Sequence, residues 1–347
     1  MIPIEKKDRI YDRDERYSRQ IILKEIGKKG QRKLFNSRVV IIGCGALGST
    51  IANNLVRIGI GFVRIVDRDL VELSNLQRQN LYDERDIGLP KASAATDKLR
   101  CINADVEIEA VIEDVTAKNI EKIIGDMDIV LDGTDNMLTR FLINDACIKH
   151  DIPWIYGGAV GTQGMSMNIL PGKTPCFRCI LPNLPKAGSL PTCDTLGVLN
   201  SIPTVIASIE TTEAIKILLD KNNFNRHLIV YDIWTHEFHS INIKKNESCE
   251  CCVKHNFQFL KSELKTSIIK LCGTDGFQIT PAGSNKISFK ELKQELESIG
   301  EVSIDEVLLK FKIKNYEINI FRNGRAIIYG AEDEKTAKSL YARYIGL

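Results

Sequence analysis

The stretch IIGCGALGS at residues 41–49 constrains the fold of this chain more than any other feature. It overlaps the apolar run RVVII at residues 38–42, which is typical of a strand buried on both faces of a parallel sheet. Gly43, Gly45 and Gly48 match the pattern G-x-G-x-x-G, which lets backbone N–H groups approach a phosphate when it joins a strand to a helix. The pattern alone does not distinguish NAD, FAD and ATP sites, or a nucleotide site from a tight structural turn.

Strands and helices alternate in the prediction over the first half of the chain. Continuous apolar runs predict strands, and apolar residues spaced three and four apart predict helices. This order is typical of a Rossmann-like, doubly wound α/β sheet, in which ligands bind in the crevice beyond the carboxyl ends of the strands. The predicted elements are strand 38–42, helix 49–59, strand 62–67, strand 106–115, helix 116–125, strand 127–135, helix 137–150 and strand 152–158.

The rest of the chain is predicted to finish this sheet and to form a smaller second domain. A loop rich in proline and glycine precedes the last elements of the sheet, which are a helix at 204–220 and strands at 227–234 and 237–245. A new pattern after residue 255 predicts a small α+β appendage, and Asn323-Gly324 between two alternating runs predicts a hairpin. We therefore expect an N-terminal helical arm at 1–37, an α/β domain at 38–255 and the appendage at 256–347.

Charge and hydropathy exclude two classes of function. The chain has 47 basic and 45 acidic residues, a formal charge of +2, and no clustered basic excess that would indicate a nucleic-acid binder. No apolar run approaches the roughly 18 to 20 residues that a membrane span needs. The N-terminal arm has mixed charges and lacks the apolar segment of a signal peptide. We expect a cytoplasmic protein that binds neither nucleic acid nor membranes.

Polar residues after the second predicted strand favour a triphosphate. Asp67 ends that strand 19 residues after Gly48, where an acid commonly binds a ribose hydroxyl of NAD or ATP. Arg78 and Lys91 follow, and each alone would be interpreted as a surface charge. Combined with the amides of Asn75, Gln77 and Gln79, they indicate a highly charged anion, because a triphosphate needs cations and amide donors around it.

The stretch LDGTDN at 131–136 places two acids at the carboxyl end of another strand. Magnesium prefers one or two carboxylates together with phosphate oxygens. Asp135 is therefore a candidate magnesium ligand, and Asp132 a candidate helper. The alternative is that Thr134, Asp135 or Asn136 simply caps the helix that follows.

Two C-x-x-C pairs predict a metal site. Each pair has the spacing of a structural zinc knuckle, but the 69 residues between the pairs require the fold to bring them together. The pairs are Cys176/Cys179 and Cys249/Cys252, with Cys251 and His255 as alternatives for the last ligand.

Four of the six cysteines outside these pairs are interpreted from the stretches that contain them. Cys44, Cys101 and Cys147 lie in apolar or helical stretches, so we expect them to pack in the core as free thiols. Cys193 lies in the loop rich in proline and glycine, and it is equally compatible with a thiolate nucleophile and with an ordinary loop residue.

Several motifs occur in the order seen in a known family. The chain resembles the ThiF/MoeB branch of the ubiquitin-activating-enzyme superfamily over about residues 14–255, and its tail resembles, more weakly, the extension of some bacterial members. The motifs are RYSRQ, GCGALGS, DRDLVELSNLQRQ, LPKA, LDGTDN, PCFRC and TCDTLGV.

The resemblance implies a Mg·ATP-dependent adenylyltransferase with bound zinc. It would activate the C-terminal glycine of a ubiquitin-like sulfur carrier that ends in Gly-Gly, in thiamine or molybdopterin biosynthesis. Arg19 of RYSRQ would reach the ATP of the neighbouring subunit, which requires a homodimer. The family motifs also imply that Asp67 holds the ribose, Asn75, Arg78 and Lys91 bind the phosphates and Asp135 holds Mg²⁺. The rest of the nucleotide site would be Gly43, Gly45, Ala46, Gly48, Asp69, Ser74, Gln79 and Asn136.

Three points stay open at this stage. An NAD-dependent oxidoreductase and a non-catalytic binder of a ubiquitin-like partner are the alternative functions. Cys193 matches a position that forms a covalent bond to the carrier in some members of the family and is dispensable in others. The sulfur donor is expected to be a separate sulfurtransferase or cysteine desulfurase, because no rhodanese-like domain is evident after residue 255.

Overall fold

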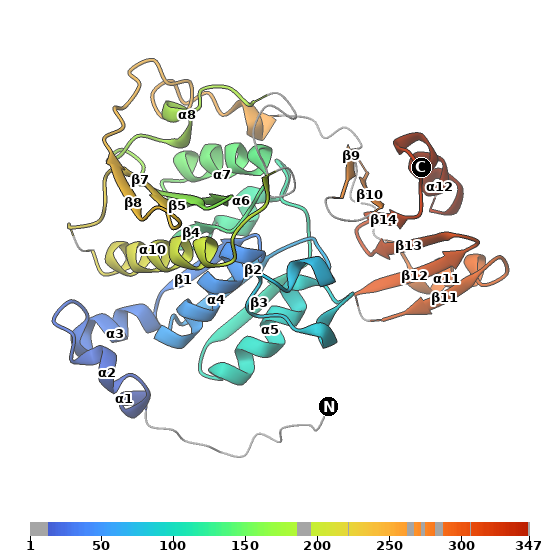
Figure 1. The fold of residues 1–347 in the computed structure, drawn as a ribbon, viewed down its shortest axis with the longest axis horizontal. Coiled ribbons are helices and arrows are strands. Elements are labelled where there is room, and N and C mark those ends of the chain that lie inside the picture. The colour runs from blue at the N-terminus through green and yellow to red at the C-terminus, as the bar shows by residue number, and fades with distance from the viewer. Residues whose placement is uncertain are drawn as a thin grey trace. The chain divides into compact units, whose positions relative to one another are not determined.

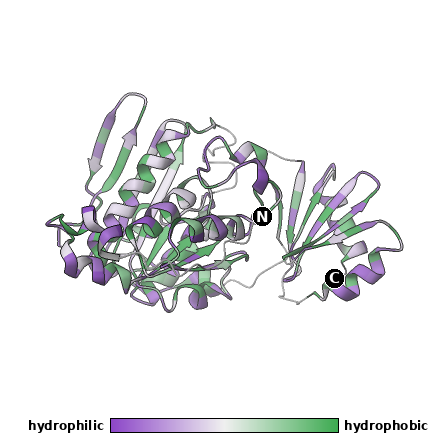
Figure 2. Cartoon of the chain, turned by 90° about the horizontal axis from the view of Figure 1, so that it is seen from below, coloured by the Kyte–Doolittle hydropathy of each residue, from purple (hydrophilic) through white to green (hydrophobic). Residues whose placement is uncertain are grey.

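The computed structural model describes residues 13–185, 196–220, 222–261, 267–271, 275–281, 287–305 and 307–345 (Figure 1). The chain forms two compact units that divide between Leu260 and Lys261. Figure 2 shows hydrophobic residues along many of the strands and hydrophilic residues on much of the helical surface. Within the described residues, the helices are too short or too polar to cross a bilayer.

The first unit contains an eight-stranded sheet with the order β3-β2-β1-β4-β5-β6-β7-β8. The first five strands in this order are parallel, and β6, β7 and β8 continue the sheet as antiparallel strands. This confirms the predicted Rossmann-like fold. The strands are β1 Arg38–Ile42, β2 Phe62–Val66, β3 Glu107–Val111, β4 Ile129–Asp132, β5 Trp154–Val160, β6 Gln163–Ile169, β7 Leu228–Asp232 and β8 Glu237–Ile241.

Helices cover both faces of this sheet (Figure 1). Val39 and Ile41 of β1 belong to the core under α4 and α10, whereas Val40 and Ile42 belong to the core under α6 and α7. Alternate residues of one strand therefore enter opposite cores, as period-two geometry requires. The helices are α1 Arg13–Arg16, α2 Ser18–Ile21, α3 Gly27–Phe35, α4 Ala46–Ile58, α5 Lys91–Ile102, α6 Ile120–Ile124, α7 Met137–Lys149, α8 Phe177–Ile180 and α10 Ser201–Leu218, with short 3-10 turns at Leu73–Asn75, Glu84–Asp86 and Gln258–Lys261.

Three helices begin at positions other than those predicted, and the first is α4, which begins at Ala46 and not at residue 49. The helix predicted from residue 116 begins at Ile120, because the side chain of Asn119 accepts the backbone N–H of Thr116 at 2.8 Å and closes a turn before the helix. Helix α10 begins at Ser201 and includes Pro203 in its first turn. Proline is tolerated there because N–H groups of the first turn have no partner within the helix.

The N-terminal arm is held against the end of α4. Gln20 and Gln31 both donate their side-chain amides to the carbonyl oxygen of Ile58, at 3.0 and 2.8 Å. The ring of Tyr17 lies against Gly59, where a β-carbon would come within 2.5 Å of it. Arg19, between these anchors, is exposed.

The second unit has a six-stranded antiparallel sheet with the order β11-β12-β13-β14-β10-β9. Helices α11 Phe289–Leu296 and α12 Glu334–Tyr344 pack on it around one apolar core, and a hairpin turns at Asn323-Gly324 as predicted. This confirms the α+β appendage. The strands are β9 Ser267–Lys270, β10 Gly276–Thr280, β11 Glu301–Ile304, β12 Leu308–Ile313, β13 Tyr316–Phe321 and β14 Ala326–Tyr329.

Candidate nucleotide and metal sites

The three glycines between β1 and α4 have different roles. Gly43 has a φ of +88°, and a β-carbon on it would lie 2.6 Å from the carbonyl carbon of Gly133. A β-carbon on Gly48 would lie 1.9 Å from the carbonyl oxygen of Gly43. These two glycines therefore let the backbone segments cross closely. A β-carbon on Gly45 would meet only the side-chain amide of Gln79, at 3.8 Å, so the space beside Gly45 is open.

Gly45 also leaves the N-terminus of α4 uncapped. It is the N-cap residue, has no side chain to accept a hydrogen bond, and precedes Ala46 at the first helical position. The first N–H groups of a helix lack partners within the helix and carry a partial positive charge. The end of α4 is thus suited to bind a phosphate.

Asp67 is fixed at the end of β2 by two backbone donors. Its carboxylate accepts the N–H of Cys44 at 2.6 Å and the N–H of Asp69 at 2.7 Å. Burial raises the pKa of Asp67, Lys91 acts to lower it, and the charge of Asp69 raises it further. The acid at the predicted ribose position therefore lies directly against the glycine loop.

Lys91 is not a surface charge. It is the first residue of α5, only 7% exposed, and its Nζ lies 3.4 Å from a carboxylate oxygen of Asp69. Burial acts to lower the pKa of Lys91, but the charges of Asp69, Asp67 and Asp135 outweigh burial and raise it. The structure thus keeps a buried ammonium group beside the predicted nucleotide position.

Two buried amides next to the loop have oxygens without a partner. Asn75 and Gln79 are 7% and 4% exposed, and neither Asn75 Oδ1 nor Gln79 Oε1 accepts a hydrogen bond within the described residues. Such atoms cost free energy unless something pairs with them. Arg78 is half-buried and donates to the carbonyl of the exposed Ser74 at 3.0 Å. Gln77 is exposed.

The two acids of the turn between β4 and α7 lie in different environments. Asp132 is fully buried, forms an ion pair with Arg140 at 2.9 Å and accepts the N–H of Thr134. Both of its oxygens are thus engaged inside the protein, and its role as a helper in metal binding stays a prediction. Asp135 is exposed. Asn136 caps α7 by accepting a backbone N–H at 3.1 Å, which supports the capping alternative for that residue.

Sequence reasoning missed three charged residues. Arg68 pairs with Asp114 at 3.0 Å, and Arg140 holds the β4–α7 turn through Asp132 and the carbonyl of Thr134. Glu210 of α10 is fully buried, near the charges of Asp132 and Arg140. Only Arg140 and Glu210 left a signal, which is a charged residue directly next to an apolar one in a helix.

Residues 17–251 match the model of the ThiF family. The chain belongs to the ThiF family. One relative, the sulfur carrier protein ThiS adenylyltransferase of Bacillus subtilis (strain 168), is 40% identical over 95% of this chain and 99% of its own length.

Other ThiF-family likenesses cover less of the chain. The SAMP-activating enzyme E1 of Haloferax volcanii is 38% identical over 69% of this chain and 88% of its own. A crystal structure of E. coli MccB with ATP superposes with a TM-score of 0.60 and 25% identity, over 68% of this chain and 74% of that one.

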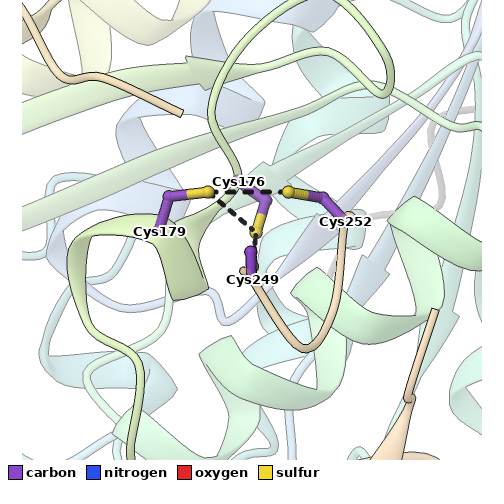
Figure 3. A group of neighbouring side chains, drawn as sticks. All are labelled: Cys176, Cys179, Cys249 and Cys252. Carbon is purple, nitrogen blue, oxygen red and sulfur yellow. Dashed lines mark hydrogen bonds between the residues drawn. The ribbon is translucent and has the colours of Figure 1, made fainter. Parts of the chain in front are cut away.

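The four cysteines of the two pairs come together in this ThiF-family chain (Figure 3). Their sulfur atoms all lie within 4.8 Å of one another, so they could hold one metal ion. The sulfur of Cys251 instead accepts a hydrogen bond from Asn144 at 3.1 Å, and neither it nor His255 belongs to the group. The members are Cys176, Cys179, Cys249 and Cys252.

The remaining cysteines divide by position. Cys44 and Cys147 are buried as predicted, and burial raises the pKa of the Cys44 thiol to about 12. Cys101 is exposed, so its predicted place in the core is wrong; it lies in the last turn of α5 on the side away from the sheet. Cys193 lies outside the described residues.

Proposed function

We propose that this protein adenylylates the C-terminal glycine of a ubiquitin-like sulfur carrier with Mg·ATP. The observation that carries the proposal is the buried Lys91 beside an open glycine loop, in a chain of the ThiF family. A hydride-transfer cofactor would not need a buried ammonium group at this place. The relative that matches 95% of the chain is named for ThiS, so we propose a ThiS-like carrier ahead of a MoaD-like one.

Charge neutralisation is the main task of such a site. The attacking carboxylate and the α-phosphate are both anions, so their approach costs electrostatic energy unless cations surround them. Lys91, Arg78 and the N–H groups at the start of α4 would hold the phosphates and favour departure of pyrophosphate. The nucleophile is already ionised at neutral pH, so the reaction needs no general base.

The remaining ligands fit Mg·ATP. Asp67 would accept a ribose hydroxyl through lone pairs that its two backbone donors leave available. Asp135 is the exposed carboxylate of the β4–α7 turn and would hold the magnesium ion. When bound, that ion neutralises charge that develops on the leaving pyrophosphate. The nucleotide would also contact the loop and neighbouring residues, which are Gly43, Gly45, Ala46, Gly48, Asp69, Ser74, Asn75, Gln79 and Asn136.

Partner proteins and a second metal complete the proposal. We propose a homodimer in which the exposed Arg19 reaches the ATP of the partner subunit. The four-cysteine group would hold zinc, for which four thiolates are a common structural ligand set. A separate sulfurtransferase or cysteine desulfurase would supply sulfur in the cytoplasm, and Cys193 would have an accessory or transfer role. The parts 1–37, 38–255 and 256–347 would be the arm, the adenylation domain and the appendage.

The exposed hairpin of β7 and β8 is the surface that we propose for the carrier. Trp234 in its turn is 73% exposed and Phe238 in β8 is 56% exposed. Strand β8 is the edge of the eight-stranded sheet. Exposed aromatic side chains and an unpaired edge are typical features of protein docking sites.

The direct test is to incubate the protein with Mg·ATP and each carrier and to weigh the carrier. We expect an added AMP on the ThiS-like carrier and ATP:pyrophosphate exchange that requires it. A carrier that lacks its final glycine is the control. If the protein quenches NADH fluorescence and exchanges no pyrophosphate, the oxidoreductase alternative replaces this proposal. If Asp135→Ala exchanges pyrophosphate as fast as wild type, the assignment of the magnesium ligand is wrong.

A further inference from the structure

Asn144 of α7 forms hydrogen bonds with residues that lie between the two cysteines of each pair. The side-chain oxygen of Asn144 accepts the backbone N–H of Phe177, within the first pair, at 2.8 Å. Its amide nitrogen donates to the sulfur of Cys251, within the second pair, at 3.1 Å. Asn144 is fully buried, so water does not compete for either bond. A single amide therefore joins two chain segments that lie far apart in the sequence.

The next residue of α7 makes a second, independent bridge. Asp145 forms a buried ion pair with Arg178 of the first pair, at 3.2 Å, and accepts the backbone N–H of Phe259 at 3.2 Å. The guanidinium of Arg178 also donates to the carbonyl of Asn256, just after the second pair, at 3.2 Å. Asp145 and Arg178 are 0% and 2% exposed, so removal of either leaves a buried charge without its partner.

These contacts have an energetic consequence for the metal site. Four thiolates that bind one ion repel one another, and bringing distant loops together costs loop-closure entropy. Both costs make the free energy of metal binding less favourable unless the protein already holds the two loops together. Hydrogen bonds and ion pairs from a buried helix to the residues around metal ligands orient those ligands.

We propose that Asn144 and Asp145 assemble the four-cysteine site, holding the two cysteine pairs in register so that metal is retained. They are positioning residues, and the four cysteines stay the only ligands. The inference rests on the proposed zinc site, but it assigns a role to two residues that do not touch the metal.

The test measures zinc release. Zinc-loaded protein is mixed with a chromogenic zinc chelator, and the rate of zinc transfer is followed by absorbance for wild type, Asn144→Ala and Asp145→Asn. Cobalt-substituted samples are recorded in parallel, because thiolate-to-cobalt charge-transfer bands report the sulfur ligands. We expect each variant to release zinc about tenfold faster or more, with cobalt bands like those of wild type.

Two matched controls separate this role from general destabilisation. Asn103 is another buried asparagine of the first unit, with three side-chain hydrogen bonds, to Tyr17, Val56 and Asp105. Asp132 with Arg140 is another buried ion pair. Neither touches the cysteine pairs, so Asn103→Ala and Asp132→Asn should release zinc within about twofold of the wild-type rate.

The outcomes are distinct. The inference is overturned if both α7 variants release zinc at the wild-type rate, if the control variants release it as fast as the α7 variants, or if the cobalt bands of the α7 variants differ from those of wild type. If Asn144→Ala does not fold, Asn144→Asp carries the same test, since it keeps the acceptor for Phe177 and loses the donor to Cys251. Wild-type protein that binds neither zinc nor cobalt overturns the zinc site as well, whereas failure to adenylylate a carrier leaves this result untouched.

Discussion

The carbonyl oxygen of Gly43 lies 1.9 Å from the position that a β-carbon on Gly48 would occupy. That distance is far inside van der Waals contact, and the obstacle is backbone, which cannot move aside as a flexible side chain can. The third glycine of the pattern therefore serves the crossing of strand and helix. The space at Gly45 is the part of the loop left open to a ligand.

The first prediction contrasts Gly48→Ala with Gly45→Ala. Gly48→Ala should destabilise the protein by about 3 kcal/mol or more, because the added methyl group forces backbone apart. Gly45→Ala should cost less, about 1 to 2 kcal/mol, because its β-carbon would meet no backbone atom, although its ψ of −142° lies outside the regions that alanine prefers. It should also raise KM for ATP. Urea unfolding and pyrophosphate exchange measure the two effects. Equal stability of the two variants would contradict the division of roles.

The second prediction concerns the two lysines of α5. Lys91→Met should lower the rate of ATP:pyrophosphate exchange by about 100-fold or more, because it removes a buried cation from the proposed phosphate site. Lys98→Met is the control. Lys98 lies on the same helix as Lys91 but away from the glycine loop, and the substitution removes its ion pairs with Asp83 and Asp86. Exchange rates that fall equally in both variants would show a general effect of charge on α5.

Periodicity predicted the fold because it reports burial directly. Residues 39–42 enter two cores, and all four are β-branched and apolar, as a doubly covered strand requires. The glycine loop, Asp67 and the four cysteines were predicted because each motif has a local spacing that its chemistry dictates.

The other features of the site depend on hydrogen-bond and ion-pair partners that the spacing of residues in the sequence does not reveal. Asp132 and Asp135 are three residues apart in one turn, but only the structure shows that Arg140 engages the first and leaves the second exposed. Cys101 lies in a helix with one buried face, and sequence alone did not show on which side it falls. Cys251 is two residues from Cys249, but its sulfur accepts a hydrogen bond from Asn144, and Cys252 is the fourth member of the group.

The third prediction follows from the buried Glu210. Neither of its carboxyl oxygens has a hydrogen-bond partner within the described residues. Burial raises the pKa of Glu210 well above its usual value of 4.5, Asp132 raises it further, and Arg140 acts to lower it. The folded protein therefore keeps this proton at a pH where the unfolded chain has released it. The associated stability is complete below pH 4.5 and is lost as the pH rises through the folded pKa.

Glu210→Gln should remove this dependence, because glutamine has nearly the same shape and does not titrate. We compare the free energy of unfolding of the variant with that of wild type. The difference should increase in favour of the variant by up to about 1.4 kcal/mol for each pH unit above 4.5, until the pH reaches the folded pKa of Glu210. Urea unfolding at several pH values from 5 to 8 measures it, with Glu237→Gln on the exposed strand β8 as control. Parallel curves for wild type and Glu210→Gln would contradict the prediction.

The fourth prediction tests the carrier surface on the β7–β8 hairpin. Trp234→Ala and Phe238→Ala should each raise KM for the carrier by about tenfold or more, because large exposed aromatic residues are the usual anchors of protein interfaces. KM for ATP and the free energy of unfolding should stay near wild type, since both side chains are mostly exposed. Val253→Ala, an exposed apolar residue away from the hairpin, is the control. Unchanged carrier KM in both aromatic variants would move the docking surface elsewhere on the chain.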